Sequence, residues 1–230
     1  MTRHIGIAAV SPEGAALCYR QIFRQATPFL GPDRRLRVSL HSEPLGDYLA
    51  AVRAQDWHAV GDLLRRSAVL LAQCGAEFCL SPDNAVQHGV QLAEAGSPIP
   101  WLNMPDLVAL AVDNDHRKVV GLIGTKMVTT ASTYQTHLGL KGVQVLAPGA
   151  EEVDELDRII FQELLYGEIK PKSQQTVLNI IRHLADRGCE AIILASSEAP
   201  LVVTQAVSPL PLYDAADILA RGAVRRAMSP

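Results

Sequence analysis

The chain has 230 residues, of which 48% are apolar and 20% charged, and its formal net charge is −3. These values are typical of a globular protein of one or two domains that buries a sizeable core. The sequence has no basic block, no acidic tail and no apolar run near about 18 residues, which argues against a nucleic-acid partner and a membrane span.

The apolar run within positions 1–10 is too short for a secretion signal, and we interpret it as the first strand. Cysteines, at positions 18, 74, 79 and 189, show no Cys-x-x-Cys spacing. We therefore expect buried, reduced thiols in a cytoplasmic protein. The seven histidines show no metal-ligand spacing, so no metal is expected.

Apolar, strand-like runs alternate with helical patterns along the rest of the chain. The predicted strands cover Ile5–Val10, Val38–His41, Phe78–Leu80, Val119–Gly124, Val143–Ala147 and Ala191–Ala195. One helical face is shared by Val60, Leu63, Leu64, Ser67 and Leu71, and another by Val177, Ile180, Ile181 and Leu184. A further helix is expected from the acidic residues 151–155. This alternation predicts an α/β fold in which helices flank mostly parallel sheets.

One sequence pattern occurs twice in the chain. Gly75 and Gly188 each follow a helical pattern, and each precedes a glutamate two positions on, an apolar strand and a polar turn. Aligning the two glycines places Asp83 opposite Ser196, 113 residues apart. The strands that open each half also match, with Gly6 and Gly121 separated by 115 residues. Two matches at nearly one offset indicate duplication.

Duplication predicts two pseudo-symmetric α/β domains, the first over residues 1–112 plus 208–230 and the second over residues 113–207. Ligands of open parallel sheets bind beyond the carboxyl ends of the strands. Asp83 and Ser196 both lie just past such an end. We expect the two halves to face each other across one crevice, so that a small ligand is approached from both sides.

These strings resemble the aspartate/glutamate racemase family. The likeness covers nearly the whole chain and includes the opening Gly121–Thr125, the strand Gly188–Leu194, Ser197-Glu198 and Pro200-Leu201 after it, Pro12-Glu13, and Asp214 with Ala220. The resemblance implies a dimer and proton chemistry on a small carboxylate without any cofactor. It also implies that a pair of cysteines should stand at the two equivalent strand ends.

Both cysteine positions have changed here. Where the family has Cys-Asn-Thr, this chain has Asp83-Asn84-Ala85, and where the family has Cys-Thr-Glu, it has Ser196-Ser197-Glu198. Gln87 and Leu219 replace two histidines common in the family, although His88 follows Gln87. Two-thiol racemisation is therefore not available to this chain.

The replacement pair suggests proton transfer from one side of the substrate. An aspartate is ionised near neutrality and is a weak base unless its pKa is raised. A serine hydroxyl needs an adjacent base, and none is identifiable beside Ser196 in the sequence. Asp83 could move one proton, while Ser196 acts as a donor or relay. This pattern fits lyase or isomerase chemistry, with amino-acid racemisation or epimerisation and a non-catalytic ligand-binding role as alternatives.

The remaining candidate binding residues are Ser11, Asn84, Ala85, Thr125, Ser197 and Glu198. Helix N-termini with serine, asparagine and threonine side chains are suited to a carboxylate ligand. An ordinary structural role fits several of them equally well. Ser11 and Thr125 could each be a plain helix cap, and Ser81-Pro82-Asp83 and Ser196-Ser197-Glu198 could each be a plain helix start.

Overall fold

The computed structural model describes residues 2–31 and 36–229. The chain forms two compact units, which we call unit 1 (residues 1–104 and 216–230) and unit 2 (residues 105–215). The domain ranges expected from the sequence assign residues 105–112 and 208–215 to the first half. In the structure these two segments belong to unit 2.

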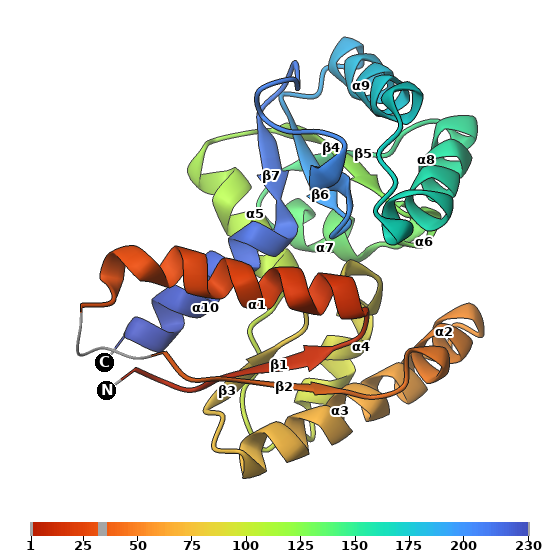
Figure 1. The fold of residues 1–230 in the computed structure, drawn as a ribbon. Helices are drawn as coiled ribbons and strands as arrows, with labels where there is room; N and C mark the ends of the chain where they lie inside the picture. The colour runs from red at the N-terminus through yellow and green to blue at the C-terminus, as the bar shows by residue number, and fades with distance from the viewer. Residues whose placement is uncertain (1, 32–35, 230) are drawn as a thin grey trace. The chain divides into compact units, whose positions relative to one another are not determined.

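Unit 1 contains a three-stranded parallel sheet in the order β2-β1-β3. Its strands are β1 (Ile5–Ala9), β2 (Val38–Ser42) and β3 (Phe78–Leu80). Its helices are α1 (Pro12–Ala26), α2 (Leu45–Arg53), α3 (Trp57–Gln73), α4 (Gln87–Glu94) and α10 (Ala215–Met228), with short 3-10 turns η1 (Thr27–Phe29) and η2 (Asn84–Val86). Helices α1 and α10 lie on one face of the sheet and α3 lies on the other (Figure 1).

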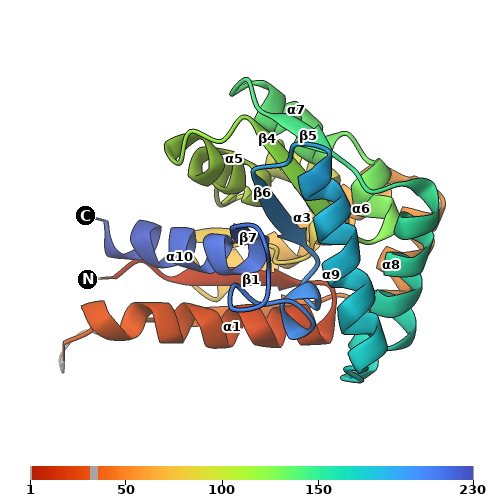
Figure 2. The ribbon, with the colours of Figure 1, turned by 90° about the horizontal axis from the view of Figure 1, so that it is seen from above.

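Unit 2 contains a four-stranded parallel sheet in the order β5-β4-β6-β7. Its strands are β4 (Val119–Gly124), β5 (Gln144–Leu146), β6 (Ala191–Ala195) and β7 (Leu212–Asp214). Its helices are α5 (Met104–Asn114), α6 (Lys126–Thr130), α7 (Thr133–Gly139), α8 (Ala150–Gln162) and α9 (Pro171–Asp186), with η3 (Leu164–Tyr166) and η4 (Ala199–Leu201). Helices α5 and α7 cover one face of this sheet, and α8 and α9 cover the other (Figure 2).

The two units repeat one folding pattern. In each, the first strand is central and pairs in parallel with the next two strands of its unit. Gly75 and Gly188 both adopt a positive φ, of 87° and 92°, a conformation that glycine adopts without strain. The glutamates two residues later also match. Glu77 accepts the backbone N–H of His4 at 2.9 Å, and Glu190 accepts that of Lys118 at 2.8 Å.

These contacts explain the sequence repeat physically. The glycine ends a helix, and the glutamate then ties the start of the third strand to the start of the first at the amino edge of the sheet. The pairing of β6 with β7 also has a reduced counterpart in unit 1, where Cys79 forms a single parallel bridge with Trp101. The expected α/β class with parallel sheets flanked by helices is confirmed.

The buried positions follow the predicted helical faces. Val60, Leu64 and Leu71 are buried on α3, and Val177, Ile181 and Leu184 on α9, where they pack in the core of unit 2. The expectation that every cysteine is buried is wrong for Cys74, which lies exposed at the end of α3. The other three thiols are buried, and burial raises the pKa of Cys18 to about 12.

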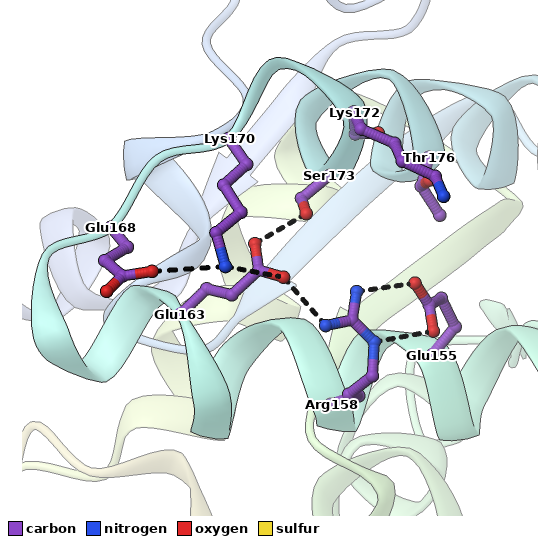
Figure 3. A network of polar contacts seen from close by, with 8 residues as sticks. All are labelled: Glu155, Arg158, Glu163, Glu168, Lys170, Lys172, Ser173 and Thr176. Carbon is purple, nitrogen blue, oxygen red and sulfur yellow. Dashed lines mark hydrogen bonds and ion pairs between the residues drawn. The ribbon is translucent and has the colours of Figure 1, made fainter.

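A buried carboxylate fixes the connection between α8 and α9 (Figure 3). Only 2% of Glu163 is exposed. It accepts a hydrogen bond from Ser173 Oγ at 2.6 Å and one from Arg158 Nη1 at 2.7 Å, with Lys170 Nζ at 3.7 Å. Arg158 also pairs with Glu155. The hydrogen bond from Ser173, followed by that from Arg158, holds the pKa of Glu163 below its ordinary value.

Candidate functional site

The candidate residues of unit 1 collect at the carboxyl edge of its sheet. Because β1 and β3 run in parallel with Ile7 opposite Leu80, the segments that follow them leave the sheet at the same edge. Ser11 follows β1, and Ser81 and Asp83 follow β3. The register therefore brings together at one edge the turns that the sequence singled out in this half.

Asp83 is the residue from which η2 begins. Its Oδ1 accepts the backbone N–H of Ala85 at 3.0 Å, so Asp83 is the helix cap and Ser81 is not. The side chain is partly exposed, while Asn84 beside it is buried. A carboxylate held in this way by a backbone donor presents its second oxygen to other partners.

Gln87 holds the loop that carries Asp83. Its buried Nε2 donates to the carbonyl oxygen of Ser81 at 3.0 Å and to that of Asp83 at 2.8 Å. The residue at the position of a family histidine therefore positions the backbone here. His88, the neighbouring histidine, is exposed and packs edge-on against Trp57.

A polar layer next to Asp83 was not predicted. Ser67 is fully buried, and its Oγ lies 3.0 Å from Nδ1 of His41. Tyr48 is buried beside Ser67, and burial is the main reason why its pKa is raised, with the charge of Glu43 and then that of Asp83 adding to the rise. The available signal was Ser67 itself, a polar residue on an otherwise apolar helical face.

Ser11 has the geometry of an ordinary helix cap. Its Oγ accepts the backbone N–H of Gly14 at 3.1 Å, Pro12 is the first residue of α1, and Glu13 lies in the first turn. The Ser11 hydroxyl keeps its own proton as a donor. The cap and a ligand contact are therefore compatible at this position.

The candidate residues of unit 2 collect at the carboxyl edge of its own sheet. Gly124, the last residue of β4, is in register with Ala195, the last residue of β6. Thr125 and Ser196 directly follow these two residues, so they lie on neighbouring segments of the chain. The strands approach so closely here that a Cβ on Gly124 would lie 2.8 Å from the Ala195 carbonyl oxygen. Glycine is thus required at this position by the packing.

Ser196 has a carboxylate beside it, contrary to the expectation that no base accompanies it. Its Oγ donates to Oε2 of Glu198 at 2.8 Å and accepts the backbone N–H of Glu198 at 3.2 Å. Only 5% of Ser196 and 8% of Glu198 are exposed. The turn that separates them by two positions directs both side chains to the same place. This hydroxyl therefore has the partner that serine chemistry needs.

Thr125 does not cap the helix that it precedes. The backbone N–H of Lys126 is accepted by Asp157 Oδ1 at 2.8 Å, and Nζ of Lys126 pairs with Asp154 at 2.6 Å on the exposed surface. The Thr125 hydroxyl is buried and has no hydrogen-bond partner within the described residues. A buried hydroxyl without a partner is unfavourable, and a ligand atom would relieve it.

Within residues 2–31 and 36–229, no three histidine, cysteine, aspartate or glutamate side chains cluster as they would around a metal ion. None of the helices there combines the length and the apolar character that crossing a bilayer would require.

Comparison with known proteins gives a consistent result for the whole chain. The family model of the Asp/Glu/Hydantoin racemases matches residues 7–223. A Yersinia pestis protein described as a candidate Asp/Glu racemase is similar over all of both chains, with 26% identity and a TM-score of 0.91. An aspartate racemase homologue from Pyrococcus horikoshii OT3 also matches over all of both chains, with 25% identity and a TM-score of 0.87.

More distant structures share the fold alone. A glutamate racemase from Francisella tularensis, solved with D-glutamate, is 15% identical, with a TM-score of 0.68. The match covers 96% of this chain and 79% of that one. The architecture of two sheet-containing units is thus that of solved racemases.

Proposed function

Because the chain belongs to the Asp/Glu/Hydantoin racemase family, we propose that it moves a proton on a small carboxylic acid without a cofactor. The family consists of racemases, which are isomerases. In this proposal Asp83 and Ser196 take the place of the two family cysteines, in a reaction of the isomerase or lyase type. The protein would work as a homodimer in the cytoplasm.

The observation that carries the proposal is the hydrogen bond from Ser196 to Glu198. The glutamate that follows the family's second cysteine is retained here as Glu198, and its buried carboxylate has the Ser196 hydroxyl as its side-chain partner. Such an arrangement is typical of a hydroxyl prepared for proton transfer.

The proposed binding groups lie in the turns that follow β1, β3, β4 and β6. Thr125 brings a buried, unsatisfied hydroxyl. Ser197, next to Ser196, is partly exposed, and Asn84 and Ala85 follow Asp83 at the start of η2. Together with Ser11 they offer hydroxyl, amide and backbone donors, which suit the carboxylate of a substrate.

Conversion in D2O tests the proposal. The protein is incubated with L-aspartate, L-glutamate and a panel of other small α-substituted carboxylic acids, and products are followed by NMR and chiral chromatography. We expect a deuterated or rearranged product from at least one acid. Asp83→Asn should lower product formation by about 100-fold or more, the size of a lost general acid or base.

The matched control is Asp56→Asn, because Asp56 caps α3 through the N–H of Ala59 in the same way as Asp83 caps η2. It should leave turnover unchanged. If acids raise the melting temperature but none is converted, the protein is a ligand-binding homologue. Asp83→Cys combined with Ser196→Cys provides a second test, since racemisation of aspartate or glutamate by that variant would show that the scaffold takes the family substrates.

A further inference from the structure

We propose that His4 is a pH-sensitive latch at the amino edge of the sheet of unit 1, and that its protonation loosens this edge. His4 directly precedes β1, far along the strand from the turns of the candidate site. The latch is independent of the proposed reaction and concerns the stability of unit 1 alone. Mild acid should therefore open unit 1 in preference to unit 2.

His4 connects the starts of all three strands of unit 1. Its backbone N–H donates to Glu77 Oε1 at 2.9 Å, and its carbonyl oxygen accepts the backbone N–H of Glu77 at 2.9 Å. Glu77 directly precedes β3. On the other side, Nε2 of His4 lies 3.0 Å from Oγ of Ser39 on β2. One residue thus joins β1 to both of its neighbours at the edge where the sheet begins.

The surroundings of the imidazole favour its neutral form. Only 6% of His4 is exposed, and its Nδ1 is buried without a hydrogen-bond partner among the described residues. Protonation would place a new donor at Nδ1 and a positive charge on the ring. Burying an unpaired charge together with an unsatisfied donor is strongly unfavourable. The closed edge therefore accepts the neutral ring and resists the charged one.

The groups around the ring do not offset this cost. Burial is the main reason why the pKa of His4 lies below its ordinary value of 6.5, and the positive charge of Arg37 lowers it further. The backbone of Gly75 and the charge of Glu77 act in the opposite direction, but the lowering prevails. Arg37 and Glu77 are both exposed, so solvent screens their charges and leaves burial as the dominant cause.

The lowered pKa sets the direction of the pH dependence. When the edge opens, His4 reaches water and binds a proton more readily than in the closed sheet. The stabilisation by neutral His4 is therefore complete above pH 6.5 and is lost as the pH falls through the lowered value. One proton taken up on opening changes the opening equilibrium by up to about tenfold per pH unit.

Unit 2 has the equivalent backbone contact without the latch. Glu190 accepts the backbone N–H of Lys118 at 2.8 Å, so Lys118 occupies the position of His4 in the repeat. Its side chain is exposed. A solvated lysine is charged near and below neutrality in both the open and the closed state. The amino edge of unit 2 should therefore not respond to mild acid through this residue.

Hydrogen exchange at single amides, followed by NMR between pH 7 and 5, tests the latch. The reporters are the N–H groups of Glu77, bonded to the His4 carbonyl, and of Glu190, bonded to that of Val119. After correction for intrinsic exchange, the protection of Glu77 relative to Glu190 should fall by up to about tenfold per pH unit below 6.5. In His4→Gln, which can still bond to Ser39 but does not titrate, this ratio should stay constant.

The matched control is His58→Gln, which removes an exposed histidine from α3 of the same unit and should keep the wild-type response. An NMR titration of the His4 ring adds a measurement that needs no change at His4. Its pKa should lie below 6.5 in the wild type and rise in Arg37→Gln. A constant ratio in the wild type, an unchanged response in His4→Gln, or a His4 pKa at or above 6.5 would each overturn the latch.

Discussion

Unit 2 contains two buried glutamates that each accept a hydrogen bond from a serine, but only one of them also has cationic partners among the described residues. Glu163 accepts hydrogen bonds from Ser173 and Arg158, and Lys170 forms an ion pair with it. Glu198 accepts a hydrogen bond from Ser196 Oγ, and none of the ion pairs of the described residues includes it. Within that part of the chain, the first carboxylate therefore has cationic partners and the second does not.

Under the proposed function, this difference predicts a structural role for Glu163 and a reactive role for Glu198. Charge-assisted hydrogen bonds to a cation stabilise the charged form of a carboxylate and hold it in place. Glu163 thereby ties the end of α8 to the start of α9. A carboxylate that must accept a proton in each turnover cannot be stabilised as strongly. The comparison predicts that Glu163 matters for stability and Glu198 for turnover, and four substitutions test it.

Glu163→Ala should have the largest effect on stability, lowering the free energy of unfolding by about 3 kcal/mol. It removes the acceptor of buried Ser173 and one of the two carboxylate partners of Arg158, which keeps its hydrogen bonds to Glu155. Chemical denaturation followed by circular dichroism would measure it. A loss below about 1 kcal/mol would show that the network contributes little.

Ser173→Ala should lower the free energy of unfolding by about 2 kcal/mol at pH 7, since it removes a hydrogen bond to a charged acceptor. The Ser173 contact is the main reason why the pKa of Glu163 lies below its ordinary value of 4.5. That stabilisation is present above pH 4.5 and is lost as the pH falls through the lowered value.

The difference between the wild type and Ser173→Ala should therefore shrink in acid. Denaturation curves at several pH values between 7 and 3 would show this. Thr176→Ala in the same helix is the control, because its hydroxyl donates to the Lys172 carbonyl oxygen and not to a carboxylate. A difference that stays constant down to pH 3 would separate the Ser173 contact from the ionisation of Glu163.

Glu198→Gln should change the free energy of unfolding by less than about 1 kcal/mol. The lost charge–hydroxyl contact is offset because a buried carboxylate without a cation is replaced by a neutral amide. Thermal and chemical denaturation would measure this next to the conversion test in D2O. Destabilisation of about 2 kcal/mol or more would place Glu198 with Glu163 as a structural residue.

Glu155→Gln should have the smallest effect, within about 0.5 kcal/mol, because its ion pair with Arg158 is solvent-exposed on both sides. High salt should reduce even this difference. The measurement fixes the baseline for the other three variants. An effect as large as that of Ser173→Ala would mean that the exposed Glu155–Arg158 pair is coupled to the buried Glu163–Ser173 contact.

Much of the fold could be predicted from periodicity and repetition. The strands Phe78–Leu80, Val119–Gly124 and Ala191–Ala195 were bounded correctly, because continuous apolar runs of that length favour buried strands. The strand β7 was missed. Leu212–Asp214 has three residues and follows a proline, and its pairing with β6 gives it a strand conformation that local pattern does not reveal.

The chemistry of the site was less predictable. The positions of Asp83 and Ser196 came from the repeat, but the contact between Ser196 and Glu198 depends on how the turn directs two side chains, which spacing alone does not define. The capping of Lys126 by Asp157 joins residues 31 positions apart and was equally inaccessible. Glu163 gave no signal, because a glutamate near a helix end is usually exposed.

Glu77 and Glu190 anchor the amino edges of the two sheets through equivalent backbone contacts, and neither contributes to the turns at the carboxyl edges. The anchoring contacts and the candidate site residues therefore lie at opposite ends of the first and third strands of each unit. A protein engineer could treat the residues after β3 and β6 as exchangeable cassettes, because replacing them leaves the anchoring glutamates and their register untouched.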